Sequence, residues 1–159
     1  MKQEINSARR RALKTGGSLG LMGLLSAVGL IRPGLVQAEW KKAAFEAKTM
    51  EEVLAALGVA TSENNATIFL SVPEIAENGA VVPVTVTSSL AHIEQISILV
   101  DKNPNVLAAQ FVFPEGTEGF ITARVKMGQT AMVIALVKAD GKFYRAAKEV
   151  KVTAGGCGG

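Results

Sequence analysis

The sequence has few of the residue types from which catalytic and metal sites are built. Its 159 residues include one His, one Cys, one Trp and one Tyr, and aromatic residues make up only 5%. A single Cys cannot form an internal disulfide, and one His with one Cys cannot supply a His/Cys metal cluster. We therefore expect no disulfide framework, no bound metal and no cofactor in this chain.

Charged residues are also scarce, at 19%, whereas apolar residues reach 48%. This composition is too apolar for a disordered chain, and the length allows one ordinary domain with a tail. The sequence contains no phosphate-binding loop, nucleotide fingerprint, haem-attachment motif or serine elbow. It therefore predicts one folded domain that has no enzymatic turnover of its own.

The first 38 residues have the pattern of a cleavable export signal. A basic start is followed by Thr15–Ile31, which has 17 uncharged residues, and then by the small-residue site Val36-Gln37-Ala38. A transmembrane anchor is a weaker interpretation, because the uncharged stretch is shorter than about 20 residues and contains five glycines. We expect cleavage after Ala38 and no stable membrane insertion afterwards.

The basic cluster of this segment resembles the twin-arginine export signal, whose pattern is Ser/Thr-Arg-Arg-x-Phe-Leu-Lys. The residues that match the pattern are Arg9, Arg10, Leu13 and Lys14. Ala8 and Ala12 depart from it, which leaves the general secretory route open. Since the twin-arginine route exports folded proteins that carry a cofactor or a bound partner, we expect a periplasmic protein that travels with a partner.

Removal of residues 1–38 changes the sign of the net charge. The full chain has a formal charge of +3, but the signal takes six of 17 basic residues and one of 14 acidic residues. Residues 39–159 then carry 11 basic and 13 acidic residues, a formal charge of −2. The basicity belongs to the signal, so the composition gives no support for nucleic-acid binding.

Residues 39–58 have the apolar spacing of an amphipathic helix, with intervals of three and four. Thr49 and Glu52 form a capping-box pattern, and Gly58 supplies a left-handed stop. The spacing therefore predicts a helical lead that restarts at Thr49. Its alanine-rich apolar face and mixed charges favour packing on its own domain over binding to a membrane surface.

Residues 59–152 are the predicted sandwich domain, and from Thr67 the pattern changes to a period of two, which is typical of β-strands. The alternation and the turn residues predict seven strands at 67–71, 80–87, 94–100, 106–113, 119–127, 130–138 and 142–152. Asp140-Gly141 is a typical two-residue hairpin turn. Short strands with regular turns predict an all-β, immunoglobulin-like antiparallel sandwich, although the Cys–Trp–Cys core of antibody domains is absent.

The run 131–137 is apolar on both faces of its predicted strand. A strand in a small sandwich normally keeps one face in water. Two explanations remain open at this point: the lead helix covers the second face, or another subunit buries it in a largely apolar interface.

Few other polar residues are candidates for catalysis. His92 is the only histidine, and a lone histidine at the start of a strand is most often a surface or turn residue. Glu115 and Glu118 flank a glycine turn, where we expect both carboxylates to be solvated.

Residues 153–159 form a glycine-rich tail around the single cysteine, Cys157. The glycines that flank it are Gly155, Gly156, Gly158 and Gly159. Glycine makes such a segment thin and flexible, and Cys157 could reach roughly 17 Å beyond Val152 when the chain is extended. A catalytic cysteine is held rigidly beside its base, and this one has no base near it in the sequence. The pattern therefore predicts a carrier thiol on a flexible arm. The alternative is a tail cysteine that only forms disulfides.

The terminal Gly-Gly-Cys-Gly-Gly resembles the signature of the SoxY family, the sulfur-carrying subunits of the SoxYZ complex in bacterial thiosulfate oxidation. The export signal, the helical lead, the sandwich and the segment 101–105 leading into 111–113 agree with this resemblance. It implies that Cys157 is the covalent attachment site and that the chain forms a heterodimer with SoxZ, which lacks an export signal.

The resemblance also implies which enzymes act on the carrier. In that family the c-type cytochrome SoxAX joins thiosulfate oxidatively to the thiol, and the metal-dependent hydrolase SoxB releases the terminal sulfonate as sulfate. In complete systems SoxCD oxidises the sulfur that remains. A sulfur-to-sulfur bond suits this cycle because it can be broken again.

Two other functional classes compete with this interpretation. One is an exported immunoglobulin-like structural or interaction module whose tail cysteine forms intermolecular disulfides. The other is a ubiquitin-like sulfur carrier, which also ends in Gly-Gly but is activated with ATP at its carboxylate in the cytoplasm. The export signal and the predicted sandwich both oppose the second class.

Deletion of Gly158 and Gly159 separates a thiol carrier from a carboxylate carrier. We expect the shortened protein still to accept sulfur, because the attachment atom is on Cys157. Mass spectrometry of the loaded protein is the measurement. Complete loss of loading would instead favour attachment at the carboxylate.

Overall fold

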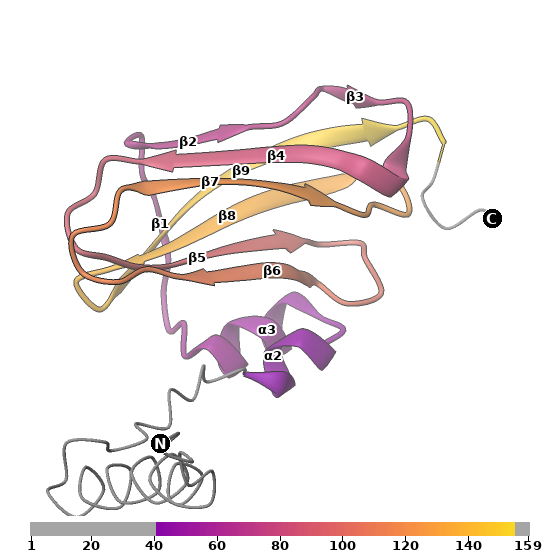
Figure 1. Ribbon diagram of the computed structural model, residues 1–159. Helices are drawn as coiled ribbons and strands as arrows, with labels where there is room; N and C mark the ends of the chain where they lie inside the picture. The colour runs from indigo at the N-terminus through magenta and orange to yellow at the C-terminus, as the bar shows by residue number, and fades with distance from the viewer. Residues whose placement is uncertain (1–40, 155–159) are drawn as a thin grey trace, which may run out of the picture. The chain divides into compact units, whose positions relative to one another are not determined.

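The computed structural model describes residues 41–154, shown in colour in Figure 1. The two helices are α2 (Lys42–Glu46) and α3 (Met50–Leu57), and one turn of 3-10 helix, η1, spans Gly79–Val81. The nine strands are β1 (Glu63–Asn64), β2 (Ile68–Ser71), β3 (Ile75–Ala76), β4 (Val82–Ser88), β5 (Ile93–Val100), β6 (Leu107–Val112), β7 (Gly119–Val125), β8 (Ala131–Ala139) and β9 (Lys142–Val152). The predicted export signal and residues 155–159 lie outside the described residues.

The strands form a sandwich of two sheets. The larger sheet has the order β1-β9-β8-β5-β6, with β3 also pairing with β9, and the smaller has the order β2-β4-β7. Each of the seven predicted strands corresponds to one of the longer strands, so the immunoglobulin-like antiparallel sandwich is confirmed. The two-residue strands β1 and β3 were not predicted, and both pair with β9 in parallel. Two residues are too few to show a period in the sequence.

The main core lies between the two sheets and follows the alternation of the strands. On β4, Val82, Val84 and Val86 are fully buried, whereas Thr85 and Thr87 lie on the outer face. β8 and β5 supply the facing layer from the larger sheet. Because one face of each strand of the smaller sheet packs inward, its register is fixed by the core.

A second core on the outer face of the larger sheet explains the apolar run of β8. Leu136 of β8 packs there with Leu99 and Leu107, and the helices contribute Val53 and Leu57. All five side chains are almost completely buried. Figure 1 shows both helices beside β5 and β6 of the larger sheet. The helical lead therefore covers the second face of β8, and this apolar run does not require another subunit.

The helical lead restarts at Thr49, as the capping-box pattern predicts. The Thr49 hydroxyl accepts a hydrogen bond from the Glu52 amide at 3.2 Å, and the Glu52 carboxylate accepts one from the Thr49 amide at 3.2 Å. The amide of Lys48 also donates to this carboxylate, and these backbone bonds lower the pKa of Glu52. Gly58 ends α3 in the left-handed conformation, with φ of 76°. Among residues 41–154, no helix is long and apolar enough to span a bilayer.

The predicted hairpin between β8 and β9 is also confirmed. Asp140 and Gly141 both have positive φ, as a two-residue hairpin turn of type I′ requires. The Glu94 carboxylate accepts hydrogen bonds from the Lys138 ammonium and, at 2.7 Å, from the Gly141 amide. The bond from Lys138 is the largest cause that lowers the pKa of Glu94, and the bond from Gly141 is the second. Glu94 thus fastens the hairpin to β5.

Gly119, at the start of β7, is the position where the fold tolerates a side chain least. A Cβ there would overlap Ile93 Cδ1 and would lie 2.8 Å from the Ser88 carbonyl oxygen, which belongs to the backbone of β4. We expect Gly119→Ala to lower the free energy of unfolding by about 1–3 kcal/mol through overpacking. Thr117→Ala, in the exposed loop two residues earlier, is the control and should change it by less than about 0.5 kcal/mol. Denaturant unfolding measures both, and equal stabilities would contradict the crowding at Gly119.

Candidate functional site

The end of β9 is held by hydrogen bonds on both of its edges. On one edge β3 pairs with it in parallel, with Ile75 beside Lys151, and the Lys151 amide donates to the Glu74 carbonyl at 2.9 Å. On the other edge the Val152 amide donates to the Thr130 hydroxyl at 3.0 Å. The strand that leads to the predicted arm is therefore fixed in position up to its last residue.

The same anchoring continues for two residues past β9. The Thr153 amide donates to the Ala76 carbonyl at 3.1 Å, and the Ala154 carbonyl accepts from the Gly79 amide at 2.8 Å. We call residues 151–154 the arm root. Cys157 lies three residues beyond Ala154, so an extended chain carries it about 10 Å from the last anchored residue. That reach is shorter than the roughly 17 Å expected from the sequence, because the free segment begins after Ala154 and not after Val152.

Two loops support the arm root from the sandwich. The Gly79 carbonyl accepts a hydrogen bond from the Met127 amide at 2.6 Å. Asn103 then joins the loops 101–105 and 126–130, because its side chain donates to the Lys126 carbonyl at 2.6 Å and accepts from the Gly128 amide at 3.3 Å. The segment 101–105, part of the resemblance noted from the sequence, thus has a structural role at this end of the molecule.

The predicted attachment residue and its neighbours lie outside the described residues. These are Cys157, Gly155, Gly156, Gly158 and Gly159, and the predicted export residues Arg9, Arg10, Leu13 and Lys14 lie outside as well. The structure therefore fixes the position of Ala154, the last anchored residue, and Cys157 is the third residue after it in the sequence.

His92 lies at the opposite end of the sandwich from the arm root. Its side chain is 66% exposed, and Nδ1 is 3.6 Å from a carboxylate oxygen of Asp140 in the β8–β9 hairpin. β9 then runs for 11 residues from that hairpin to the arm root, a length of about 33 Å. Because Cys157 reaches only about 10 Å past Ala154, His92 cannot serve it as a base. Glu115 and Glu118 are exposed, as expected.

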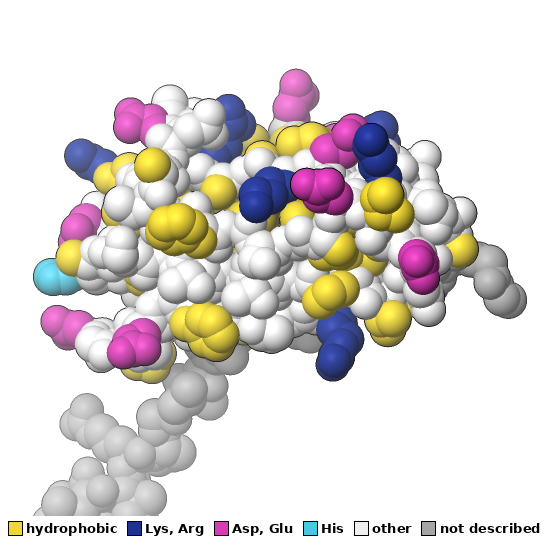
Figure 2. All heavy atoms as spheres, turned by 90° about the horizontal axis from the view of Figure 1, so that it is seen from above, with side chains coloured by type: hydrophobic (Ala, Val, Ile, Leu, Met, Phe, Trp, Pro, Cys, Tyr) yellow, Lys and Arg dark blue, Asp and Glu magenta, His cyan; other side chains and the backbone are white. Residues whose placement is uncertain are grey.

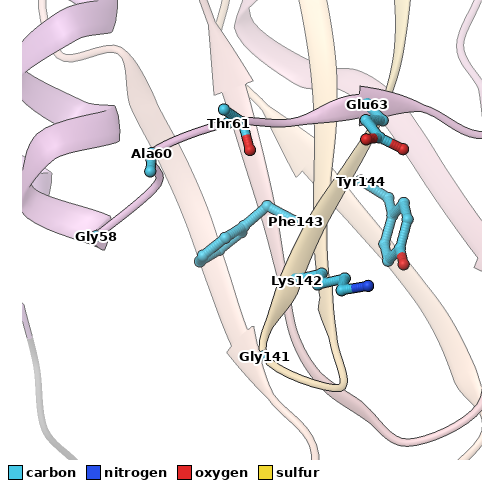
Figure 3. Close-up of a pocket in the computed structure, with 8 residues that line it drawn as sticks. All are labelled: Gly58, Ala60, Thr61, Glu63, Gly141, Lys142, Phe143 and Tyr144. Atoms are coloured by element: carbon cyan, nitrogen blue, oxygen red, sulfur yellow. The ribbon is translucent and has the colours of Figure 1, made fainter.

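A hollow of 330 Å³ lies beside the same hairpin. Figure 3 shows it between the segment after α3 and the start of β9, with Phe143 pointing toward Gly58 and Ala60, and Lys142 and Tyr144 on the other side of the strand. Like His92, this hollow is separated from the arm root by the length of β9. It therefore cannot hold a group carried on Cys157.

Another hollow, of 410 Å³, lies at the arm-root end between β6 and β7. Its walls include Asn103, Leu107, Arg124 and Lys126, and none of its lining residues is acidic. Both cations are exposed to solvent, which screens their charge. Among residues 41–154, no three His, Cys, Asp or Glu side chains gather in a group that could hold a metal ion.

The residues that hold the arm root were missed from the sequence. Gly79 lies just before the predicted strand 80–87, with no role predicted for it, but its amide donates a hydrogen bond to the Ala154 carbonyl. Thr130 was expected only at the start of a strand, but its hydroxyl binds Val152. These contacts join segments about 20 to 75 residues apart, and neither segment has a local pattern that could indicate them.

Comparison with protein families gives one match. Residues 53–157 match the family described as "Sulfur oxidation protein SoxY". The match covers about two thirds of the chain, from the middle of α3 to Cys157. It therefore includes the sandwich, the arm root and the single cysteine.

Solved structures include similar proteins. The sulfur carrier protein SoxY from Chlorobium limicola f thiosulfatophilum is 37% identical, with a TM-score of 0.59 over 65% of this chain and 94% of that one. The superoxide reductase (neelaredoxin) from Ignicoccus hospitalis is 19% identical, with a TM-score of 0.49 over 54% of this chain and 80% of that one. At that score the second similarity does not bear on fold or function. A comparison with curated proteins gives no match.

The anchoring of Val152 by Thr130 can be tested at the arm root. Thr130→Val removes the hydroxyl that accepts from the Val152 amide and keeps the shape of the side chain. We expect amide hydrogen exchange at Val152 to become about fivefold faster, since one hydrogen bond contributes about 1 kcal/mol. The matched control is Thr122→Val, whose hydroxyl bonds only to Thr85 on the outer face of the smaller sheet. Unchanged exchange at Val152 would show that Thr130 does not hold the root.

Proposed function

The chain belongs to the SoxY family of sulfur oxidation proteins, and from this membership we propose that it holds thiosulfate-derived sulfur on the Cys157 thiol. The observation that carries the proposal is the position of this thiol, three residues past a root that hydrogen bonds hold in place. A short glycine segment after a fixed root limits the reach of the sulfur to about 10 Å from the last anchored residue. The C. limicola relative is described as a sulfur carrier protein.

The loading reaction forms one sulfur–sulfur bond. The outer sulfur of thiosulfate joins Cys157 Sγ, the thiol gives up its proton, and two electrons leave to an acceptor. We propose the c-type cytochrome SoxAX as that acceptor, following the resemblance of the sequence. The product is a thiol-bound chain of two sulfurs that ends in a sulfonate group.

The release reaction then breaks the bond to the sulfonate. Water supplies an oxygen to the sulfonate sulfur, sulfate and a proton leave, and a persulfide remains on Cys157. We propose the hydrolase SoxB for this step, and SoxCD for oxidation of the remaining sulfur where it is present. Thiol–disulfide chemistry makes the linkage to Cys157 reversible, which a carrier requires.

Catalytic groups for these steps come from the partner enzymes in this proposal. His92 contacts the hairpin before β9, and Val152 ends this strand about 33 Å further on, so His92 is beyond the reach of the thiol. At the arm root the side chains of Thr130 and Thr153 form hydrogen bonds with the backbone, and the nearby carboxylates of Glu74 and Glu77 are exposed to solvent. The chain then acts as a substrate carrier and has no turnover by itself.

Location and stable partner follow from the same proposal. We place the protein in the periplasm, exported by the twin-arginine route and cleaved after Ala38, with SoxZ as its partner in a heterodimer. The domain order is then 1–38 for the signal, 39–58 for the helical lead, 59–152 for the sandwich and 153–159 for the carrier arm. With a formal charge of −2 after cleavage, nucleic acid is not a partner.

Replacement of the carrier thiol tests the proposal. Cys157→Ser should abolish thiosulfate-dependent sulfate formation by the heterodimer with its partner enzymes, because a hydroxyl cannot form the sulfur–sulfur bond. The measurement is sulfate release together with reduction of the cytochrome. His92→Ala is the control and should keep full turnover. Sulfate formation by Cys157→Ser would contradict the proposal, and a wild-type protein that only forms disulfide-linked pairs would favour a structural module.

A further inference from the structure

We propose that the apolar side chains around the arm root form the surface on which the rims of the partner enzymes' active-site clefts dock. This root surface consists of Ile75, Ala80 and Val81. The inference rests on the proposed carrier function and adds to it the place on this chain where the enzymes make contact.

The short reach of the thiol determines where an enzyme must make contact. Ala154 is anchored to Gly79, and Cys157 extends at most about 10 Å from it. An enzyme must enclose Cys157 Sγ among its reacting groups, and protein atoms then surround the intervening glycines. The rim of its cleft therefore comes into contact with the surface from which the segment departs.

The root surface lies at that point of departure. Ile75 is paired beside Lys151 of the arm root and is 58% exposed. Val81 ends the helical turn that begins at Gly79, the residue that binds Ala154, and it is 52% exposed. Ala80, between them in this turn, is also exposed. Single exposed apolar residues are common on proteins, so it is their position at the root that indicates a role.

The charges near the root indicate that the contact is apolar. The exposed cations Arg124, Lys126 and Lys151 lie near the exposed carboxylates of Glu74 and Glu77. Charges of both signs are interspersed there with an excess of only one cation, so electrostatic attraction contributes little to selecting an enzyme. Figure 2, which looks onto the molecule from above, shows hydrophobic side chains at separate places with charged side chains between them. The expected partner surface is a small apolar rim around a narrow opening.

A small surface suits the carrier cycle. A carrier must leave each enzyme after one step, and interfaces below about 1,200 Å² are typical of such transient encounters. Since every enzyme needs the same thiol on the same short segment, all of them meet the root surface. We therefore expect the cytochrome and the hydrolase to bind one at a time and to depend on the same side chains.

The test replaces the two larger side chains in the whole heterodimer. In Ile75→Ser/Val81→Ser we expect the KM of the loaded carrier for the hydrolase to rise about tenfold with kcat unchanged, because two apolar contacts are lost from binding. The KM of the unloaded carrier for the cytochrome should rise by a similar factor. The rate at which iodoacetamide alkylates Cys157 should stay the same, which shows that the thiol itself is equally accessible.

Phe120→Ser is the matched control. Phe120 is 56% exposed on β7 of the smaller sheet, and it lies five residues before Val125, which pairs with Val82 beside the root surface. That separation is about 16 Å along the strand, so the KM of the Phe120→Ser carrier for either enzyme should change by less than about twofold. Val81→Arg provides a second variant, which places a bulky cation at the rim and should raise KM for both enzymes even if the double variant fails to fold.

The outcomes separate this inference from the carrier function. If Cys157 accepts sulfur and KM is unchanged in both root variants, or if Phe120→Ser raises KM equally, the root surface is wrong and the carrier function stands. If wild-type Cys157 accepts no sulfur from thiosulfate, the carrier function itself fails. An increase in KM for only one enzyme would contradict a shared surface.

Discussion

The hydrogen bonds that hold the end of β9 are the constraint on which this account depends. β3 and Thr130 bind opposite edges of the strand, and Gly79 binds the Ala154 carbonyl. Without these hydrogen bonds the chain would be anchored at an earlier residue, and the thiol would have a longer reach. With them, the thiol lies three residues past an anchored position, so both the reach of the sulfur and its point of departure are set by the fold.

The rest of the sandwich can be understood as support for this end. The inter-sheet core fixes the positions of β4, β7 and β9. The turn before β4 and the loops after β5 and β7 meet under the arm root through Gly79 and Asn103. The helices cover the outer face of β8, where the sequence left another subunit as an equal explanation. In this proposal the domain positions a thiol, and the partner enzymes supply the chemistry.

Local sequence patterns predicted the parts of the fold that repeat along the chain. The alternation of β4, the hairpin at Asp140-Gly141 and the capping box at Thr49 depend on neighbouring residues, and the structure confirms all three. The anchoring of the arm root depends on contacts such as Gly79 with Ala154, which local patterns do not encode. The crowding at Gly119 by Ile93 was missed for the same reason. Cys157 itself could be found from sequence, because its isolation among glycines is a local feature.

The central claim is that Cys157 carries sulfur covalently, and the mass of the peptide that contains it tests this most directly. The heterodimer purified from periplasm should be mixed with thiosulfate and its partner cytochrome, then digested without reductant. The account predicts a mass increase on this peptide equal to two sulfur and three oxygen atoms, removed by treatment with a reductant. An unmodified thiol, or only disulfides between chains, would contradict it.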